Sequence, residues 1–147
     1  MTINNIIISI MLLLSLACGF SMDSIIDSWK PDSQDISYIS KTIWGEARGC
    51  CREEQEAVAW CILNRVDSDV FPDTIKEVVT APYQFQGYSE SNPDIFKDLV
   101  EDVLIRHHNG ERGIDESLLY FSGNGGYNTF RNAWRLEDAT LFWAANS

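Results

Sequence analysis

Apolar residues recur at helical spacing soon after the N-terminal segment of the chain. Ile36, Ile39 and Ile43 are separated by three and four residues, so they share one face of an α-helix. We expect this helix to begin near Asp35, because an aspartate side chain can cap the free amides of a first turn. Glu46 continues the same face, which predicts a carboxyl group in line with the buried side of the helix, near its end.

Residues 52–66 are predicted to form a second helix. Its middle, residues 57–63, is an unbroken run of small and apolar residues, which indicates a helix buried nearly all round. A short helix is expected over residues 75–79. The segment APYQFQGYSESNP, residues 81–93, is irregular and carries three aromatic residues, a combination typical of functional loops.

A third long helix is predicted to begin at Asn92-Pro93, which supply a cap and a first-turn proline, and to end before Gly110. Apolar residues repeat in it with helical period at Ile95, Phe96, Leu99, Val100, Val103 and Leu104. SLLYF at residues 117–121 is typical of a short strand, and SGNGGYN at residues 122–128 is typical of a glycine-rich turn. The fold class expected is α+β, mainly α, in one domain with a small extended or hairpin region.

Charge narrows the choice of partners. The formal net charge of −11 argues against a nucleic-acid binder, because neutralising phosphates needs a surface of Lys and Arg. It also argues against adhesion to an anionic envelope by bulk charge. Any such target must be recognised locally, in a cleft, and a chain of 147 residues is long enough for one domain with a real core.

The N-terminus has the pattern of a secretory signal. Residues 6–16 are almost wholly apolar and small residues follow, although no Lys or Arg precedes the run. We predict a signal peptide at 1–21, a linker at 22–34 and a catalytic domain at 35–147, with membrane contact only through the N-terminal signal. A retained signal-anchor and lipid attachment at Cys18 are the alternatives.

Three cysteines lie beyond the predicted signal, at Cys50, Cys51 and Cys61. Ten or eleven residues of helix span roughly 15 Å, so a disulfide between the first pair and Cys61 is not expected. The spacing gives no framework for a metal. Cys61 lies in an apolar run, where a thiol is usually inert.

Glu46 is the leading candidate for chemistry. A carboxyl group on an apolar face loses hydration, which favours its protonated form. A protonated carboxyl group can give its proton to a leaving oxygen, the role of a general acid in glycoside cleavage. The alternative from the residues alone is that Glu46 pairs with Arg48 or Arg65 and only ends a helix.

Three sequence blocks in order, TIWGEARG, EEQEAVAWCILNRV and FPDTIKEVVTAPYQFQGY, closely resemble the bacterial cell-wall hydrolase family that includes the catalytic domain of the spore cortex-lytic enzymes. The resemblance covers about residues 36–88 and continues more loosely to the end. It implies a lysozyme-like fold, the glycan strand of peptidoglycan as substrate, and Glu46 as the catalytic acid.

The reaction that the resemblance implies is lytic transglycosylation. Glu46 would protonate the glycosidic oxygen between N-acetylmuramic acid and N-acetylglucosamine, then assist attack by the muramic 6-hydroxyl, leaving a 1,6-anhydro end. One carboxylate suffices, unlike the pair usual in glycosidases. Glu53, Glu54 and Asp73 are candidates for a second carboxylate in simple hydrolysis, although we expect solvated charges at these positions.

Substrate contacts are expected from two parts of the chain. Gln84 and Phe85 resemble the family's QF pair; the amide can bond an acetamido group, and Phe85 and Tyr88 can stack on a sugar, with a core position as the alternative for Phe85. LLYFSGNGG resembles a later family block and suggests Tyr120 and Asn124. The match is imperfect because Leu119 stands where a histidine is expected.

Asn64-Arg65 matches the family's NR pair and is interpreted as structural, with Arg65 tying the helix end to an acidic group and positioning Glu46. Trp134 is expected in the core, with a place in the cleft as the alternative.

The sequence therefore predicts a secreted or cell-envelope enzyme that acts on peptidoglycan without a cofactor, in the periplasm, the cell wall or the spore cortex, or in phage lysis. An accessory protein could target it. The alternatives left open are a hydrolytic muramidase and a non-catalytic glycan-binding relative, which the paired Cys50-Cys51 and the acidity keep in consideration.

Overall fold

Residues 29–123 and 126–144 are described by the computed structural model. The chain divides into two units, residues 1–30 and 31–147, and all the helices and strands below belong to the second. The predicted signal peptide at 1–21 and most of the predicted linker lie outside the described residues. In the part of the chain that is described, no helix has the length and apolar character needed to cross a membrane.

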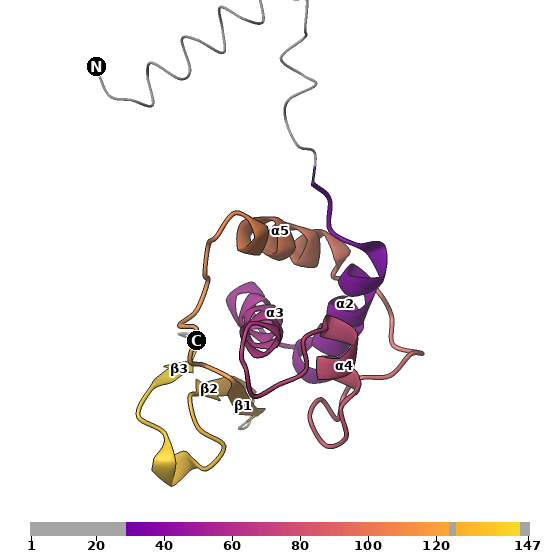
Figure 1. Ribbon diagram of the computed structural model, residues 1–147. Coiled ribbons are helices and arrows are strands. Elements are labelled where there is room, and N and C mark those ends of the chain that lie inside the picture. Colours follow the sequence, from indigo (N-terminus) through magenta and orange to yellow (C-terminus); the bar gives the residue numbers. More distant parts are fainter. Residues whose placement is uncertain (1–28, 124–125, 145–147) are drawn as a thin grey trace, which may run out of the picture. The chain divides into compact units, whose positions relative to one another are not determined.

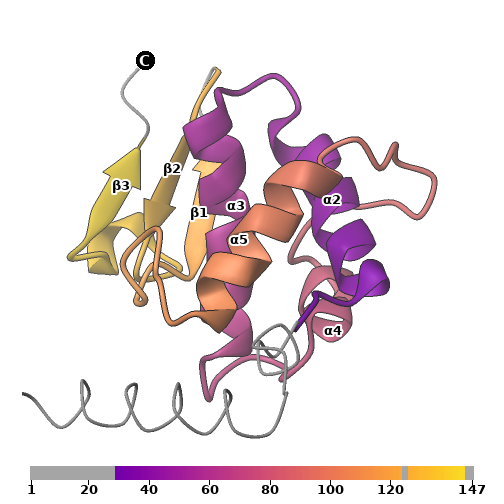
Figure 2. The same ribbon diagram turned by 90° about the horizontal axis from the view of Figure 1, so that it is seen from above.

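Helix α3 (Arg52–Val66) forms the centre of this unit. Residues 57–65 are all buried, which confirms the prediction of a helix surrounded by protein. It packs against α2 (Ser33–Ala47), α4 (Ile75–Thr80) and α5 (Lys97–His108). Figures 1 and 2 show the sheet on the other side of α3 from α2.

Helix α2 begins two residues earlier than predicted. Its cap is Asp32, whose carboxylate accepts hydrogen bonds from the amides of Gln34 at 2.7 Å and Asp35 at 3.4 Å. Asp35 instead lies in the first turn, where a negative charge favours the helix dipole. The last two residues of the predicted linker are therefore helical. Ile39 and Ile43 are fully buried, as the apolar spacing predicts.

Helix α5 begins at Lys97, later than predicted. The preceding residues are tied to other elements: the Asn92 side chain donates to the Lys41 carbonyl at 3.0 Å, and the Phe96 amide donates to Ser40 Oγ at 2.9 Å. Ile95 is consequently exposed rather than part of the buried face. The other predicted core positions in the helix, Leu99, Val100, Val103 and Leu104, are buried.

The sheet is antiparallel with strand order β1-β2-β3. Its strands are β1 (Tyr120–Gly123), β2 (Asn128–Arg131) and β3 (Phe142–Ala144), with the 3₁₀ helix η2 (Leu136–Asp138) between the last two. Phe121 pairs with Phe130, and Phe130 pairs with Trp143. Their rings pack at centroid separations of 5.2 Å in a tilted pair and 5.3 Å in an edge-to-face pair. The fold class is thus α+β and mainly α, as predicted from the sequence.

Candidate active site

Glu46 lies in the last turn of α2, one turn past the buried Ile43. Its side chain is half-buried, so the carboxyl group lies at the exposed end of the apolar face. Oε1 accepts a 2.7 Å hydrogen bond from the Gly87 amide. Within residues 29–123 and 126–144, no hydrogen bond is recorded for Oε2. One oxygen is therefore held by the backbone and the other is available for a ligand.

Two glycines make this hydrogen bond sterically feasible. A Cβ atom on Gly45 would lie 1.9 Å from the Gly87 carbonyl oxygen, and one on Gly87 would lie 2.5 Å from the Gly45 carbonyl carbon. The loop after α4 thus rests directly on the backbone of α2. The Asn92 side chain also holds this loop to α2, because it donates to the Gly87 carbonyl at 2.8 Å and to the Lys41 carbonyl at 3.0 Å.

Arg65 lies beneath this loop, with only 3% of its surface exposed. Nε donates to the Leu119 carbonyl at 2.6 Å and Nη1 donates to Gln84 Oε1 at 3.0 Å. Burial lowers the pKa of Arg65, and the neighbouring side chains of Cys61, Tyr120 and Glu46 partly oppose this shift. The hydrogen-bond partners are thus a carbonyl and a neutral amide, while Glu46, the acidic group expected nearby, acts on Arg65 through its charge.

Gln84 is fixed in orientation by Arg65. A guanidinium group only donates hydrogen bonds, so it must face the amide oxygen, and the Gln84 NH₂ group points elsewhere. Gln84 lines a pocket of about 360 Å³ together with Val70, Phe71, Tyr83, Tyr120 and Trp134. Gln84 thus lies at a hollow of the surface, and its contact with a substrate stays a prediction.

Phe85 and Tyr88 are not placed for stacking on a sugar in this pocket. Phe85 is 5% exposed and packs between the Arg65 guanidinium, 4.6 Å from its ring centroid, and Phe121. Tyr88 packs near Tyr38, and its hydroxyl donates to Glu90 at 2.6 Å. Desolvation and this hydrogen bond raise the pKa of Tyr88. Of the two readings of Phe85, the structure favours the core.

Tyr120 lies in the pocket, with its ring 5.9 Å from both Phe71 and Trp134. Trp134 is 65% exposed, so the expected core position is wrong, and the residue lines the pocket as in the alternative. Asn124 lies outside the described residues. Tyr83, which the sequence did not single out, is the most exposed aromatic of the pocket, and nothing in its sequence neighbourhood distinguishes it from an ordinary loop tyrosine.

Glu54 does not carry a solvated charge, contrary to expectation. It is 2% exposed, and its carboxylate accepts a hydrogen bond from the Asn128 amide at the start of β2. The pKa of the Cys50 thiol is raised to about 11, mainly by desolvation and to a smaller extent by the neighbouring Glu54. Glu53 and Asp73 are exposed, as expected.

The three described cysteines are free. Burial raises the pKa of the Cys61 thiol to about 11, so little of it is the reactive thiolate at neutral pH. Within the described part of the chain, no cluster of three or more His, Cys, Asp or Glu side chains could hold a metal ion.

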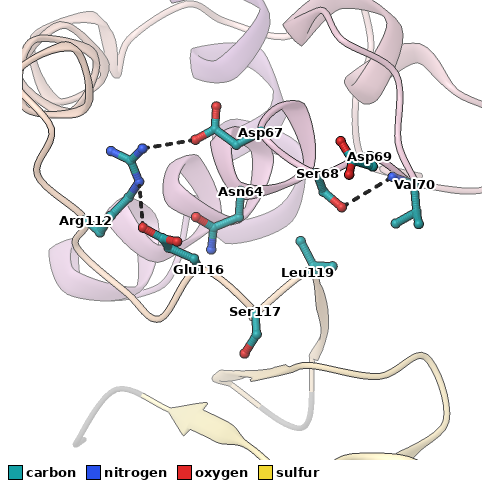
Figure 3. A pocket seen from close by; sticks show the side chains of 9 residues that line it. All are labelled: Asn64, Asp67, Ser68, Asp69, Val70, Arg112, Glu116, Ser117 and Leu119. Atoms are coloured by element: carbon teal, nitrogen blue, oxygen red, sulfur yellow. Dashed lines mark hydrogen bonds and ion pairs between the residues drawn. The ribbon is translucent and has the colours of Figure 1, made fainter.

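A larger pocket of about 780 Å³ lies at the end of α3 and contains neither Glu46 nor Gln84. Figure 3 shows Arg112 between Asp67 and Glu116 at its edge; the N–O distances are both 3.4 Å. His107 Nε2 also lies 2.8 Å from Asp67. The charges of this pocket are thus largely engaged with one another.

Residues 50–142 match the sequence model of a family described as Cell Wall Hydrolase. Glu46 lies just before the matched segment, whereas Gln84 and Tyr120 lie within it. No solved structure gives a significant match, so a lysozyme-like fold stays a prediction.

Several curated relatives are named spore cortex-lytic enzyme. The protein of Oceanobacillus iheyensis is 34% identical over 89 residues, which cover 60% of this chain and 32% of the relative. That of Bacillus subtilis is 33% identical over 96 residues, covering 61% and 30%. That of Halalkalibacterium halodurans is 39% identical over 89 residues, covering 60% and 27%. The matched segment spans about a third of the length of these relatives.

Proposed function

The chain belongs to the cell wall hydrolase family, and from this premise we propose that it cleaves the glycan strands of peptidoglycan, with Glu46 as the catalytic acid and base. The observation that carries the proposal is the 2.7 Å hydrogen bond from the Gly87 amide to Glu46 Oε1. It holds Oε1 of a half-buried carboxyl group against the loop, and the proposal assigns the transferred proton to Oε2.

The proposed reaction is lytic transglycosylation. Glu46 gives its proton to the glycosidic oxygen as the bond from that oxygen to the anomeric carbon breaks. The muramic 6-hydroxyl then attacks the anomeric carbon and its proton returns to Glu46, which restores the carboxyl group. The products are a 1,6-anhydro end and a free hydroxyl, and no water is consumed.

The surroundings of the three candidates for a second carboxylate support a mechanism with one acidic residue. Glu54 is held in the interior by the Asn128 amide, and Glu53 and Asp73 are exposed. A hydrolytic mechanism would instead need water and usually a second carboxyl group at the cleaved bond.

The test is digestion of purified peptidoglycan by the full chain and by Glu46→Gln, with products identified by mass spectrometry. Anhydro-ended fragments from the parent and at least about a hundredfold fewer from the variant are expected. Glu53→Gln is the matched control, because it neutralises an exposed carboxylate on the next helix, and it should retain activity.

Each other outcome has a definite meaning. Fragments with reducing ends, heavier by one water, would establish hydrolysis and contradict the transglycosylase proposal. Equal activity of the parent and Glu46→Gln would remove Glu46 from the mechanism. No release from either cortex or vegetative wall, with binding retained, would favour a non-catalytic glycan-binding relative.

We infer a site of action in the cell envelope or spore cortex. The support is the family and the name of the relatives, together with the apolar N-terminal pattern in the sequence. Fractionation of the producing cells, followed by detection of the chain in wall and cytosolic fractions, tests this location.

A further inference from the structure

The pocket beside Gln84 is lined by uncharged residues, although the chain as a whole is rich in acidic residues. None of its six lining residues, Val70, Phe71, Tyr83, Gln84, Tyr120 and Trp134, carries a charge. Tyr83 is 86% exposed and Trp134 is 65% exposed. Large apolar rings left in water at a hollow are typical of a binding site, and neutral walls fit an uncharged ligand.

Gln84 gives this pocket a hydrogen-bond donor of fixed direction. Its Oε1 atom accepts from the Arg65 guanidinium at 3.0 Å, and Arg65 is itself buried and held by the Leu119 carbonyl. No acceptor is recorded for Gln84 Nε2 among the residues that the structure describes. The NH₂ group is therefore available to a ligand carbonyl, such as that of an acetamido group.

Tyr83 is held in a conformation that its side chain disfavours. Its φ angle is +64°, and it is the one non-glycine residue with positive φ in the described ranges 29–123 and 126–144. A bulky residue in the left-handed region is uncommon and costs free energy. Strain of this kind is often found at functional sites, and here it places an exposed ring at the pocket.

The same loop connects the pocket to Glu46. Gln84 precedes Gly87 by three residues, and Gly87 donates to Glu46. Three residues of chain span at most about 11 Å, and a turn closes here because the Tyr88 amide donates to the Phe85 carbonyl. A disaccharide is long enough to reach from the pocket to the carboxyl group.

We propose that this pocket is a subsite for one N-acetylated sugar ring of the glycan strand, next to the bond at Glu46. Tyr83 and Trp134 provide aromatic faces for the apolar face of the ring, and Gln84 Nε2 donates to the acetamido oxygen. Arg65 is a positioning residue, because it orients Gln84. The proposal rests on the proposed function, since it takes the glycan strand as the ligand.

The first experiment measures binding without turnover. The full chain carrying Glu46→Gln is titrated with soluble N-acetylglucosamine oligomers, and Kd is read by calorimetry. Adding Tyr83→Gly or Trp134→Ala should weaken binding about fivefold to tenfold, the loss expected for one stacked ring. Phe142→Ala, which removes a half-exposed ring on β3 outside the pocket, should leave Kd unchanged.

Tyr83→Gly separates binding from folding. Glycine adopts positive φ without strain, so this variant should melt no lower than its parent while still binding more weakly. Unchanged Kd in both Tyr83→Gly and Trp134→Ala would overturn the subsite. Weakening by Phe142→Ala to the same degree would also overturn it, since the effect would then not belong to the pocket.

The role of Gln84 is tested with oligomers of the same length that lack the acetamido group, for example cello-oligosaccharides. The parent should prefer the N-acetylated ligand, and Gln84→Glu, which keeps an oxygen for Arg65 and removes the NH₂ donor, should lose that preference. An unaltered preference would contradict the assignment.

Binding and cleavage are measured separately, so the two proposals can fail independently. Retained binding without cleavage counts against the proposed function alone. Cleavage with unaltered Kd in the pocket variants counts against the subsite alone.

Discussion

The contact between Gly45 and Gly87 is the residue-scale feature on which the proposed site most depends. Gly45→Ala places a methyl group where the Gly87 carbonyl lies, so one backbone must move. We expect a loss of about 1–3 kcal/mol in the free energy of unfolding and a larger proportional loss of peptidoglycan cleavage, because the Gly87 amide would leave Glu46. Urea denaturation and release of soluble fragments measure the two effects.

Gly49→Ala is the control within the same GEARG block. A Cβ atom there meets nothing within 4 Å, and Gly49 does not have positive φ. Its stability should change by less than about 0.5 kcal/mol. Equal behaviour of the two alanine variants would show that the close approach of the two backbones is not needed.

A second residue-scale prediction concerns Tyr88 and Glu90. The Tyr88 hydroxyl, and then Lys41, hold the pKa of the Glu90 carboxyl below its usual value. Such a group contributes stability above its unfolded pKa, and the contribution is lost as pH falls through its folded pKa. Tyr88→Phe should therefore lower the urea midpoint at pH 7 and have a smaller effect near pH 3. A larger effect in acid would contradict this linkage, and Tyr83→Phe is the control.

At the scale of elements, the end of α3 fixes the start of the sheet. Asn64 Nδ2 donates to the carbonyls of Asp115 at 2.9 Å and Leu118 at 3.2 Å, just before β1. Asn64→Ala leaves both carbonyls without this donor, the Leu118 carbonyl in a buried setting and the Asp115 carbonyl in a partly buried one. We expect about 2 kcal/mol of destabilisation, measured by urea unfolding, together with weaker glycan binding because Tyr120 follows at once.

Asn109→Ala serves as the control for this change. Asn109 is exposed at the end of α5, so its removal should cost less than about 0.5 kcal/mol. If Asn64→Ala proved equally mild, the segment leading into β1 would be held by other contacts.

The bounds of some helices could be predicted from the sequence and those of others could not. The difference depends on whether neighbouring or distant residues stabilise the helix ends. Helix α3 has the predicted bounds because its apolar run is continuous and because residues close to its ends in sequence determine where it begins and ends. Helix α5 begins late because Ser40 and Lys41, far away in sequence, bind the residues before it. A pattern of spacing carries no information about such partners.

The site shows the same limit. Glu46 and Gln84 could be singled out from motifs, but Phe85 and Glu54 could not be placed. Glu54 lies in the first turn of a helix, a position that is solvated unless another element covers it. Here β2 covers it, and the hydrogen-bond donor on β2, Asn128, is 74 residues away in sequence. Trp134 lies among polar residues near the C-terminus, and only the fold shows that it faces the pocket rather than the core.

For the whole molecule, the formal net charge of −11 predicts a dependence of stability on salt. Excess charge of one sign destabilises a compact state through self-repulsion, and salt at physiological strength screens charges over about 8 Å. Raising NaCl at pH 7 should therefore increase Tm by roughly 4 °C, corresponding to about 1 kcal/mol, when followed by circular dichroism. The same titration near pH 4.5, where glutamates begin to be protonated, should give a smaller rise. A Tm that falls with salt at pH 7 would mean that the ion pairs around Arg106 and Arg112 outweigh the net repulsion.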